Sequence, residues 1–244
     1  MKPRSPRTLS QTRQVFESLR SAIVGCHLLP NAKLNIAAIA DEMEVSAGSV
    51  REALAMLEAE ALVVSEPARG YRVSPVSTAE LQDLVHARIE IEKLCLTEAI
   101  RHGDLTWEGE VVAAFHRLTR LAERDAQVPT RLNPDWAEGH RAFHRALVGG
   151  CPNQWLRRMH DMLYQQSERY RQLSVPLGTG GRDVQAEHQQ LVDAVLRKDI
   201  PATHALITEH LGTTARLLLD SPLLEPPAGG AEPTPALAPA AASG

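Results

Sequence analysis

Four of the ten histidines lie on the apolar faces of predicted helices in the second half of the chain. His140 and His144 are one turn apart in the same stripe as Phe143, and His188 and His210 lie among apolar residues of two later helices. A buried neutral imidazole needs partners for one donor and one acceptor, or it can give a ring nitrogen to a metal ion. The pattern therefore leaves two interpretations open: separate core histidines with hydrogen-bond partners, or one metal site assembled from three helices.

Arg88 lies on the apolar side of the first predicted helix of this half, which also carries Leu81, Ile91 and Cys95. A guanidinium turned toward a core requires an anion, because an unpaired buried charge is costly. Glu92, one turn later, could supply that anion as a structural ion pair. The alternative is a ligand pocket in which Arg88 meets an acidic molecule.

The first half of the chain offers a surface suited to DNA. A predicted helix over 46–57 turns small residues and one cation, Arg51, away from the core. Small neighbours let a helix sit deep in the major groove, where Arg51 could bond guanine or a phosphate. Glu52 could partly neutralise that charge, and an ordinary surface arginine is the plain alternative. The candidate DNA contacts from this helix and from the tip of the following hairpin are Ser46, Gly48, Ser49, Arg51, Arg69 and Gly70.

The elements that must position these residues fall into two groups. Helices over 11–24, 36–43 and 46–57, followed by strands over 62–64 and 71–73, predict a winged helix-turn-helix domain over residues 11–75. After a break at 74–78, residues 79–220 show only helical periodicity, which predicts a C-terminal all-α bundle and a mainly α protein. Its helices are expected over 79–102, 107–126, 135–149, 153–173, 183–198 and 201–219.

The two ends of the chain differ in composition from these domains. Residues 1–20 hold five basic residues and one acidic residue, so residues 1–10 are predicted to be a basic flexible arm. Such an arm could contact phosphates or remain a solvated tail. Residues 221–244 are rich in proline and alanine without periodicity, which predicts a disordered tail.

The overall composition excludes several classes of protein. Apolar residues make up 43% and charged residues 23%, which is typical of a globular chain. No run approaches the ~20 apolar residues of a membrane span, and the first residues lack a secretory stretch. The cysteines Cys26, Cys95 and Cys151 are widely spaced, which argues against a disulfide framework. We therefore expect a cytoplasmic protein without a membrane partner.

Several runs in the first domain match one family pattern. They are Leu19-Arg20-Ser21-Ala22-Ile23, Leu29-Pro30, Arg69-Gly70-Tyr71 and, most specifically, Val50-Arg51-Glu52-Ala53-Leu54-Ala55-Met56-Leu57-Glu58. With them the domain resembles the DNA-binding domain of the GntR family of bacterial transcription regulators. The resemblance implies operator contacts from the start of the third helix, from Arg51 and from the hairpin tip.

Three positions depart from that family pattern. Asn31 and Glu44 stand where glycine is usual, and a left-handed backbone at Glu44 would cost up to ~1–2 kcal/mol. Ala47 stands where arginine is usual, which removes one expected DNA contact. We therefore expect an operator sequence or affinity that differs from the family pattern.

Residues 79–220 carry further matching pieces. They are Arg88-Ile89-Glu90-Ile91-Glu92, His140-Arg141-Ala142-Phe143-His144 with Asn153, Glu187-His188 and His210-Leu211. With them the region resembles the all-helical effector domain of the FadR branch, the FCD domain. Many such domains hold a divalent metal with one Asp and three His, which implies His144, His188 and His210 as ligands. The resemblance also implies that Arg88 holds the carboxylate of an effector beside the metal.

His140 stands where the resemblance places the aspartate ligand. As a fourth ligand it would make a site of imidazoles alone, more positive by one charge and softer, which favours Zn²⁺, Ni²⁺ or Cu²⁺, with Zn²⁺ or Ni²⁺ first, over Mn²⁺ or Mg²⁺. In the alternative arrangement His140 stands apart, and the other three histidines bind the metal weakly.

These features together predict a ligand-responsive transcription regulator, a repressor, rather than an enzyme. We expect a homodimer that binds double-stranded operator DNA with two-fold symmetry and responds to a small organic acid. Two other functions stay open: a metal-dependent enzyme acting on a small carboxylate, and a regulator that senses the metal itself. Among the remaining histidines, we expect His116 to line the pocket.

Overall fold

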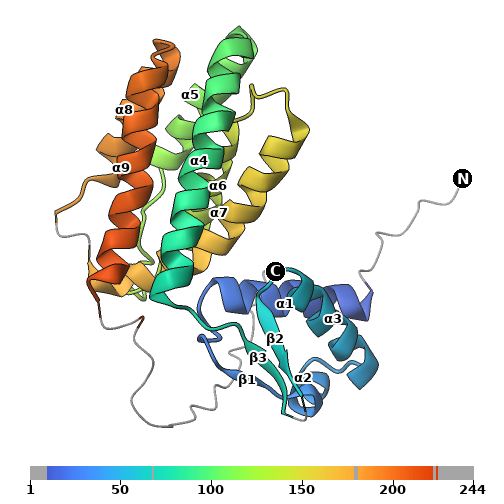
Figure 1. The fold of residues 1–244 in the computed structure, drawn as a ribbon. Coiled ribbons are helices and arrows are strands. Elements are labelled where there is room, and N and C mark those ends of the chain that lie inside the picture. Colours follow the sequence, from blue (N-terminus) through green and yellow to red (C-terminus); the bar gives the residue numbers. More distant parts are fainter. Residues whose placement is uncertain (1–9, 68, 179–180, 222–223, 225–244) are drawn as a thin grey trace, which may run out of the picture. The chain divides into compact units, whose positions relative to one another are not determined.

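The computed structural model describes residues 10–67, 69–178, 181–221 and 224, and the chain divides into two compact units (Figure 1). The boundary between the units falls between Val76 and Ser77. Helices dominate both units, which confirms the expectation of a mainly α protein. The predicted arm over 1–10 and tail over 221–244 lie almost wholly outside the described residues.

The N-terminal unit combines a helical layer with a small sheet. Its elements are α1 (Gln11–Val24), β1 (Lys33–Leu34), α2 (Ile36–Glu42), α3 (Ala47–Ala59), β2 (Val63–Glu66) and β3 (Gly70–Val73). The strands pair antiparallel in the order β1-β3-β2, and α1 packs against α3 over a core that includes Leu19 and Leu54. Strand β1 was not predicted, because two residues show no alternation and only their pairing with Arg72 and Tyr71 defines the strand.

The turn between α2 and α3 sets the direction of the exposed helix. Glu44 has φ 53° and Asn31 has φ 67°, so both residues that replace the usual glycine adopt the left-handed conformation. Helix α3 then begins at a capping residue, since Ser46 Oγ accepts the backbone N–H of Ser49 at 3.0 Å. The predicted winged helix-turn-helix is therefore confirmed, and it contains one strained residue at its central turn.

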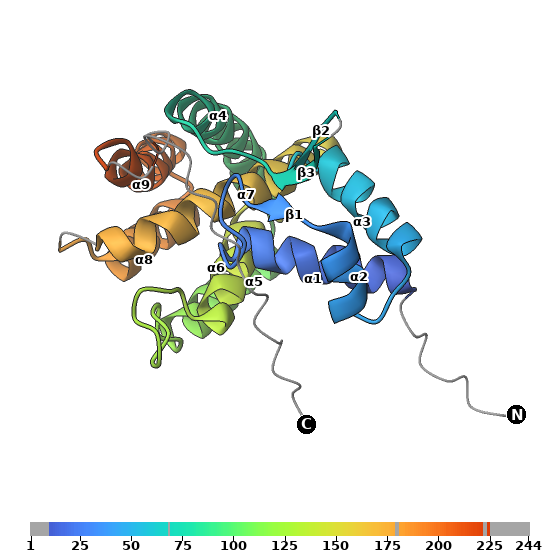
Figure 2. The ribbon, with the colours of Figure 1, turned by 90° about the horizontal axis from the view of Figure 1, so that it is seen from below.

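The C-terminal unit is an antiparallel bundle with a single extended core. Its elements are α4 (Thr78–His102), α5 (Leu105–Thr119), α6 (Pro134–Leu147), α7 (Gln154–Ser174), the short 3₁₀ helix η1 (Val175–Leu177), α8 (Val184–Leu196) and α9 (Ile200–Leu219). Helix α4 packs against α7 and α9, and α5 packs against α6 and α8. Figure 2 shows α9 beside both α4 and α8. The interior that these helices enclose is where the four predicted histidines lie.

One helix ends earlier than its periodicity predicts. The sequence indicates a helix over 107–126, whereas α5 runs over Leu105–Thr119. Beyond it the side chain of Asp125 accepts the backbone N–H groups of Gln127 and Val128, at 2.7 and 2.9 Å. This local turn competes with helical hydrogen bonding, and it leads back to an isolated bridge between Arg124 and Leu132.

Among the described residues, no helix combines the length and apolar character that crossing a bilayer requires.

Candidate metal centre and DNA-reading surface

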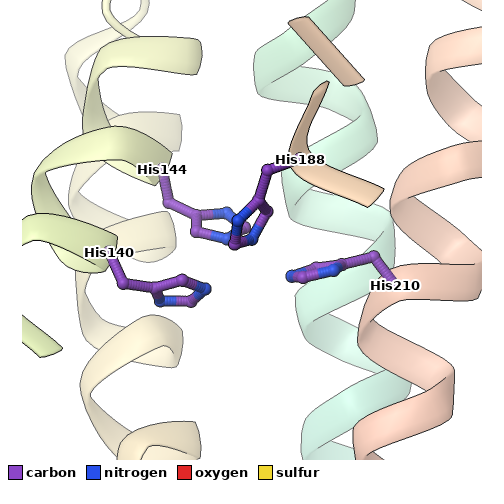
Figure 3. A group of neighbouring side chains, drawn as sticks. All are labelled: His140, His144, His188 and His210. Atoms are coloured by element: carbon purple, nitrogen blue, oxygen red, sulfur yellow. The ribbon is translucent and has the colours of Figure 1, made fainter. Parts of the chain in front are cut away.

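The four predicted histidines meet inside the helical unit. His140 and His144 come from α6, His188 from α8 and His210 from α9, and Figure 3 shows their rings turned toward one another. One nitrogen atom of each ring lies within 4.8 Å of the others. Each of the four residues is at most 5% exposed. The hypothesis of one converging cluster, rather than four scattered core histidines, is therefore confirmed for the rings themselves.

Helix capping fixes the residue at which each helix begins, and therefore which of its side chains face the interior. The side chain of Asn133 accepts the backbone N–H of Asp135 and starts α6, with Pro134 at its first turn. Asp183 caps α8 and Asp199 caps α9 in the same way. Because each helix starts at a fixed residue, the later positions on its inward face are fixed as well.

In three of the four imidazoles, Nδ1 lies within hydrogen-bond distance of a side-chain oxygen atom. Nδ1 of His140 lies 2.7 Å from Tyr164 Oη, and Nδ1 of His144 lies 2.7 Å from Glu92 Oε1. Nδ1 of His210 lies 2.7 Å from Glu187 Oε2. A ring whose Nδ1 is engaged in this way presents Nε2 to the interior, the arrangement typical of metal-ligating histidines.

Two ring nitrogens inside the cluster lack a protein partner. Nε2 of His144 and Nε2 of His188 are buried and have no hydrogen-bond partner among the described residues. A buried polar atom without a partner is costly, so such atoms call for an explanation. Two inward-facing nitrogens in a set of four neutral imidazoles fit a borderline or soft divalent ion, such as Zn²⁺.

Burial keeps these imidazoles neutral. Desolvation lowers the pKa of His144 to about 4, although Glu92 favours the charged form. Desolvation also lowers the pKa of His210, and it holds the pKa values of His140 and His188 well below the usual range. The neutral imidazole is the form that ligates a metal, so the cluster needs no proton release before binding one.

Arg88 and Glu92 form the ion pair that the sequence suggested. Arg88 Nε lies 3.3 Å from Glu92 Oε2, and Arg88 Nη1 donates to Ser167 Oγ at 2.6 Å. Burial alone would raise the pKa of Glu92, but His144 and Arg88 hold it well below its usual range. Arg88 Nη2 is buried and has no partner among the described residues, so the pair leaves one donor for a further anion.

Other side chains around the cluster were not predicted as part of a site. Tyr164 is buried on α7, and its position could have been read from the inward series His160, Tyr164 and Ser167. Arg182 makes two hydrogen bonds of 2.6 Å to Glu187, which in turn holds His210. No periodic signal identifies Arg182, because it precedes α8 and acts from a loop.

Two more histidines differ in their surroundings: the sequence pattern made no prediction for His160, and it placed His116 at the pocket. His160 is buried, with Nδ1 3.5 Å from Asp161 and Nε2 3.9 Å from Glu92. Burial would lower the pKa of His160, but these two carboxylates raise it. His116, the histidine expected to line the pocket, is instead exposed on α5 and borders a surface hollow with Leu105. Its helix turns it to solvent, so that expectation was wrong.

A cavity of about 50 Å³ lies next to the cluster. Its lining includes His140, His210, Trp136, Arg171 and Arg182. Arg171 lies with its guanidinium 5.0 Å from the centre of the Trp136 ring and forms an ion pair with Glu168. The cavity is therefore bordered both by histidines of the cluster and by the cationic side chains of Arg171 and Arg182.

The candidate DNA contacts lie on the surface of the N-terminal unit. Arg51 is exposed on α3 and has no ion pair among the described residues. Glu52 accepts a hydrogen bond from Thr12 Oγ1 at 2.8 Å, which occupies it away from Arg51. Arg69 and Gly70 are exposed at the tip of the hairpin, where Gly70 has φ 89°. Ser46, Gly48 and Ser49 surround the start of α3, with Ser46 and Gly48 exposed and Ser49 partly buried.

Comparisons with known proteins agree with both halves of this description. Residues 11–73 match the bacterial regulatory proteins of the gntR family, and residues 83–213 match the FCD domain. The HTH-type transcriptional regulator BphR of Paraburkholderia xenovorans is 36% identical over 209 residues, which cover 86% of this chain and 85% of BphR. The HTH-type transcriptional repressor GlaR of Escherichia coli is 34% identical over 205 residues, covering 81% of this chain and 91% of GlaR.

The solved structure of E. coli McbR/YncC has the same fold, with a TM-score of 0.67 over 87% of this chain and 99% of McbR/YncC, at 19% identity. The matched relatives are transcription regulators rather than enzymes. The chain therefore belongs to the GntR family of bacterial transcription regulators, with an FCD domain following its winged helix-turn-helix.

Proposed function

We propose that this regulator is a repressor whose FCD domain holds a divalent metal ion and responds to a small organic acid. The observation that carries the proposal is the cluster of four buried imidazoles, in which one nitrogen of each ring lies within 4.8 Å of the corresponding nitrogens of the other three. The E. coli relative GlaR is a transcriptional repressor, which supports the assignment of this chain as a repressor.

The metal would be held by His140, His144, His188 and His210. All four ligands are neutral nitrogens, and among the described residues no carboxylate belongs to the cluster, so Zn²⁺ or Ni²⁺ suits this site better than Mg²⁺. Glu92, Tyr164 and Glu187 orient three of the rings through their Nδ1 atoms. When bound, the ion would supply positive charge and coordination positions for an acidic ligand.

Arg88 is the protein group that we assign to the carboxylate of the effector. Its Nη2 atom is buried without a partner among the described residues, while Glu92 and Ser167 hold the rest of the guanidinium in place. A guanidinium fixed in this way loses little freedom when it binds an anion, which strengthens the contact. Arg88 would therefore both orient the acid and compensate its charge.

The N-terminal unit would read operator DNA through the exposed face of α3 and the hairpin tip. Arg51 is the candidate for direct contact with bases, and Arg69 is the candidate for the backbone. We infer a homodimer on a two-fold-symmetric operator in the cytoplasm, in which acid binding weakens the DNA complex. A coupling of ~1–3 kcal/mol between the two sites would be sufficient for such a switch.

The test measures both metal content and DNA affinity on the same purified protein. Purified chain is analysed for bound metals, an operator is selected from random duplex DNA, and affinity is measured with and without a panel of organic acids. We expect one metal ion per chain and a loss of DNA affinity of about 5–150-fold with an effective acid.

Three variants sharpen that test. His188→Ala should lose the metal, Arg88→Gln should keep the metal but lose the response to acid, and the exposed control His116→Ala should keep both. Arg51→Ala should lower operator affinity by ~1–3 kcal/mol. A wild-type protein without metal, or with DNA affinity that no acid alters, would contradict the proposal. A response to metal addition alone would identify a metal sensor instead.

A further inference from the structure

Glu58 stands at a position of α3 that electrostatics disfavours. It lies in the last turn of the helix, where the partial negative charge of the helix end makes a carboxylate unfavourable. It also follows Arg51 by seven residues, so the two side chains lie about 20° apart around the axis of α3 and about 10 Å apart along it. A negative charge therefore borders the face that is proposed to read DNA, where it repels phosphates. A carboxylate with two such disadvantages calls for an explanation.

The structure shows what this carboxylate holds. Oε1 of Glu58 accepts a hydrogen bond from the hydroxyl group of Ser65 at 2.5 Å and another from the backbone N–H of Ser65 at 3.2 Å. Ser65 lies on β2, which packs beside α3 and forms one edge of the sheet (Figure 1). An edge strand presents N–H groups that no neighbouring strand accepts, and a charged acceptor forms stronger hydrogen bonds than a neutral one. Glu58 therefore ties the edge of the hairpin to the helix.

The rest of the hairpin is braced by its own contacts. The backbone N–H of Arg69 donates to the carbonyl oxygen of Glu66 at 3.0 Å, so the turn that carries Arg69 closes on the residue after Ser65. On the returning strand, the guanidinium of Arg72 lies 3.2 Å from the Glu66 carboxylate and donates to the carbonyl oxygen of Asn31 at 3.2 Å. The hairpin therefore keeps its own shape, and its contact with α3 sets where its tip lies relative to that helix.

We propose that Glu58 is a positioning residue for DNA reading. Through Ser65 it holds the hairpin tip at the distance from α3 at which Arg51 and Arg69 reach the duplex together. This inference rests on the reading surface proposed above, and it assigns a role to a residue that itself touches no DNA. A hairpin that is ordered before DNA arrives removes a conformational cost from binding. The unfavourable place of the carboxylate is then explained by what it holds.

The test measures operator affinity on the full chain, with an operator selected from random duplex DNA. Glu58→Ala and Ser65→Ala remove the two sides of the contact, and each should lower operator affinity about 2–10-fold. Loss of a negative charge alone would raise the affinity, so the sign of the Glu58→Ala effect separates positioning from simple electrostatics. Glu58→Gln keeps an acceptor oxygen without the charge, and it should bind at least as tightly as the wild type.

A double-mutant cycle supplies a readout that a purely structural role would not change. In the wild-type background, Arg69→Ala should lower the slope of log affinity against log salt concentration by about 1, as expected for one lost phosphate contact. In the Glu58→Ala background the same substitution should change neither the affinity nor the slope, because a displaced tip no longer reaches the backbone. Arg51→Ala should lower the affinity in both backgrounds.

Glu42→Ala is the matched control for the loss of charge. Glu42 is exposed at the end of α2, and among the described residues it makes no hydrogen bond to the hairpin. Its loss should leave operator affinity equal to that of the wild type or slightly higher. Thermal melts of the N-terminal unit establish that each variant folds, and if Glu58→Ala unfolds this unit, the cycle is decided in the Ser65→Ala background.

The outcomes separate this inference from the function beneath it. If Glu58→Ala binds the operator as tightly as the wild type, or if Arg69→Ala costs the same with and without the contact, the positioning role is overturned and the reading surface stands. An Arg69→Ala variant that matches the wild type in affinity and slope would also overturn it, because the tip would then make no contact to be positioned. If the wild type selects no operator, both the positioning role and the proposed reading surface fail.

Discussion

The two units of this regulator present their functional residues in opposite ways. In the N-terminal unit, Arg51 and Arg69 are exposed and have no ion pairs among the described residues. In the helical unit, the four histidines are buried, and three of them are fixed by a second side chain at 2.7 Å. A phosphate backbone attracts exposed cations over a distance, whereas a small ligand requires groups that are fixed before it arrives.

This difference has a consequence for stability. The N-terminal unit can lose an exposed cation with little effect on its fold, because surface substitutions rarely change stability by more than about 0.5 kcal/mol. The histidine cluster shares its interior with the hydrophobic core, and Phe143 lies 4.9 Å from His188 between ring centres. Function and folding are therefore coupled in the helical unit and largely separate in the N-terminal unit.

The largest predicted effect is the loss of stability that follows when the core next to the histidines is disrupted. Phe143 is fully buried, so Phe143→Ala should lower the free energy of unfolding of the helical unit by ~3–5 kcal/mol. The N-terminal unit has its own hydrophobic cluster and should keep its melting transition. Calorimetry of the full chain should show one transition shifted and the other retained. A single transition that shifts as a whole would show that the two cores unfold together.

Sequence periodicity predicted the buried cluster well for a definite physical reason. His140 and His144 occupy an apolar stripe at helical spacing, and a stripe must face the core wherever the helix packs. The partners of these rings were not predicted, because the contact of Glu92 with His144 depends on how α4 lies against α6. Such a relation between helices is set by packing of the whole bundle and has no local signature.

The same limit explains the errors at the edges of elements. The early end of α5 follows from a turn at Asp125, and the strand β1 follows from pairing with β3. In the N-terminal unit, by contrast, capping and turn residues such as Ser46 stand next to the elements they control. Local chemistry therefore predicted most of the winged unit. In the bundle it predicted the inward residues and the i, i+4 pair of Arg88 with Glu92, but not the partners that come from other helices.

The second largest predicted effect is that acid should lower the stability of the helical unit more than that of the N-terminal unit. Nine of the ten histidines belong to the helical unit, and only His27 belongs to the other. The pKa of His144 is about 4 in the folded chain, below the usual value of 6.5, and the other three cluster rings are lowered as well. Groups of this kind bind more protons when unfolded, so their contribution to stability is complete above about pH 6.5 and is lost as pH falls toward 4.

The size of this effect follows from linkage. Each cluster imidazole should lower the stability of the metal-free helical unit by up to ~1.4 kcal/mol per pH unit within that range. His160 opposes the trend, because its pKa is raised by Asp161 and Glu92. Urea melts between pH 7 and 4.5 should show a steep loss in the helical unit and a shallow one in the N-terminal unit. His144→Asn should reduce the slope and the exposed control His116→Asn should not; equal slopes in both variants would contradict the assignment.

The smallest predicted effect concerns the strained turn of the N-terminal unit. Glu44 has φ 53°, where glycine carries no steric penalty, so Glu44→Gly should stabilise this unit by about 0.5–1 kcal/mol. The matched control is Glu42→Gly, since Glu42 is also exposed but ends α2 with helical geometry. That control should destabilise the unit by up to about 1 kcal/mol. Thermal melts of both variants should therefore move in opposite directions, whereas a loss of stability in both would show that the Glu44 side chain contributes more than its backbone conformation costs.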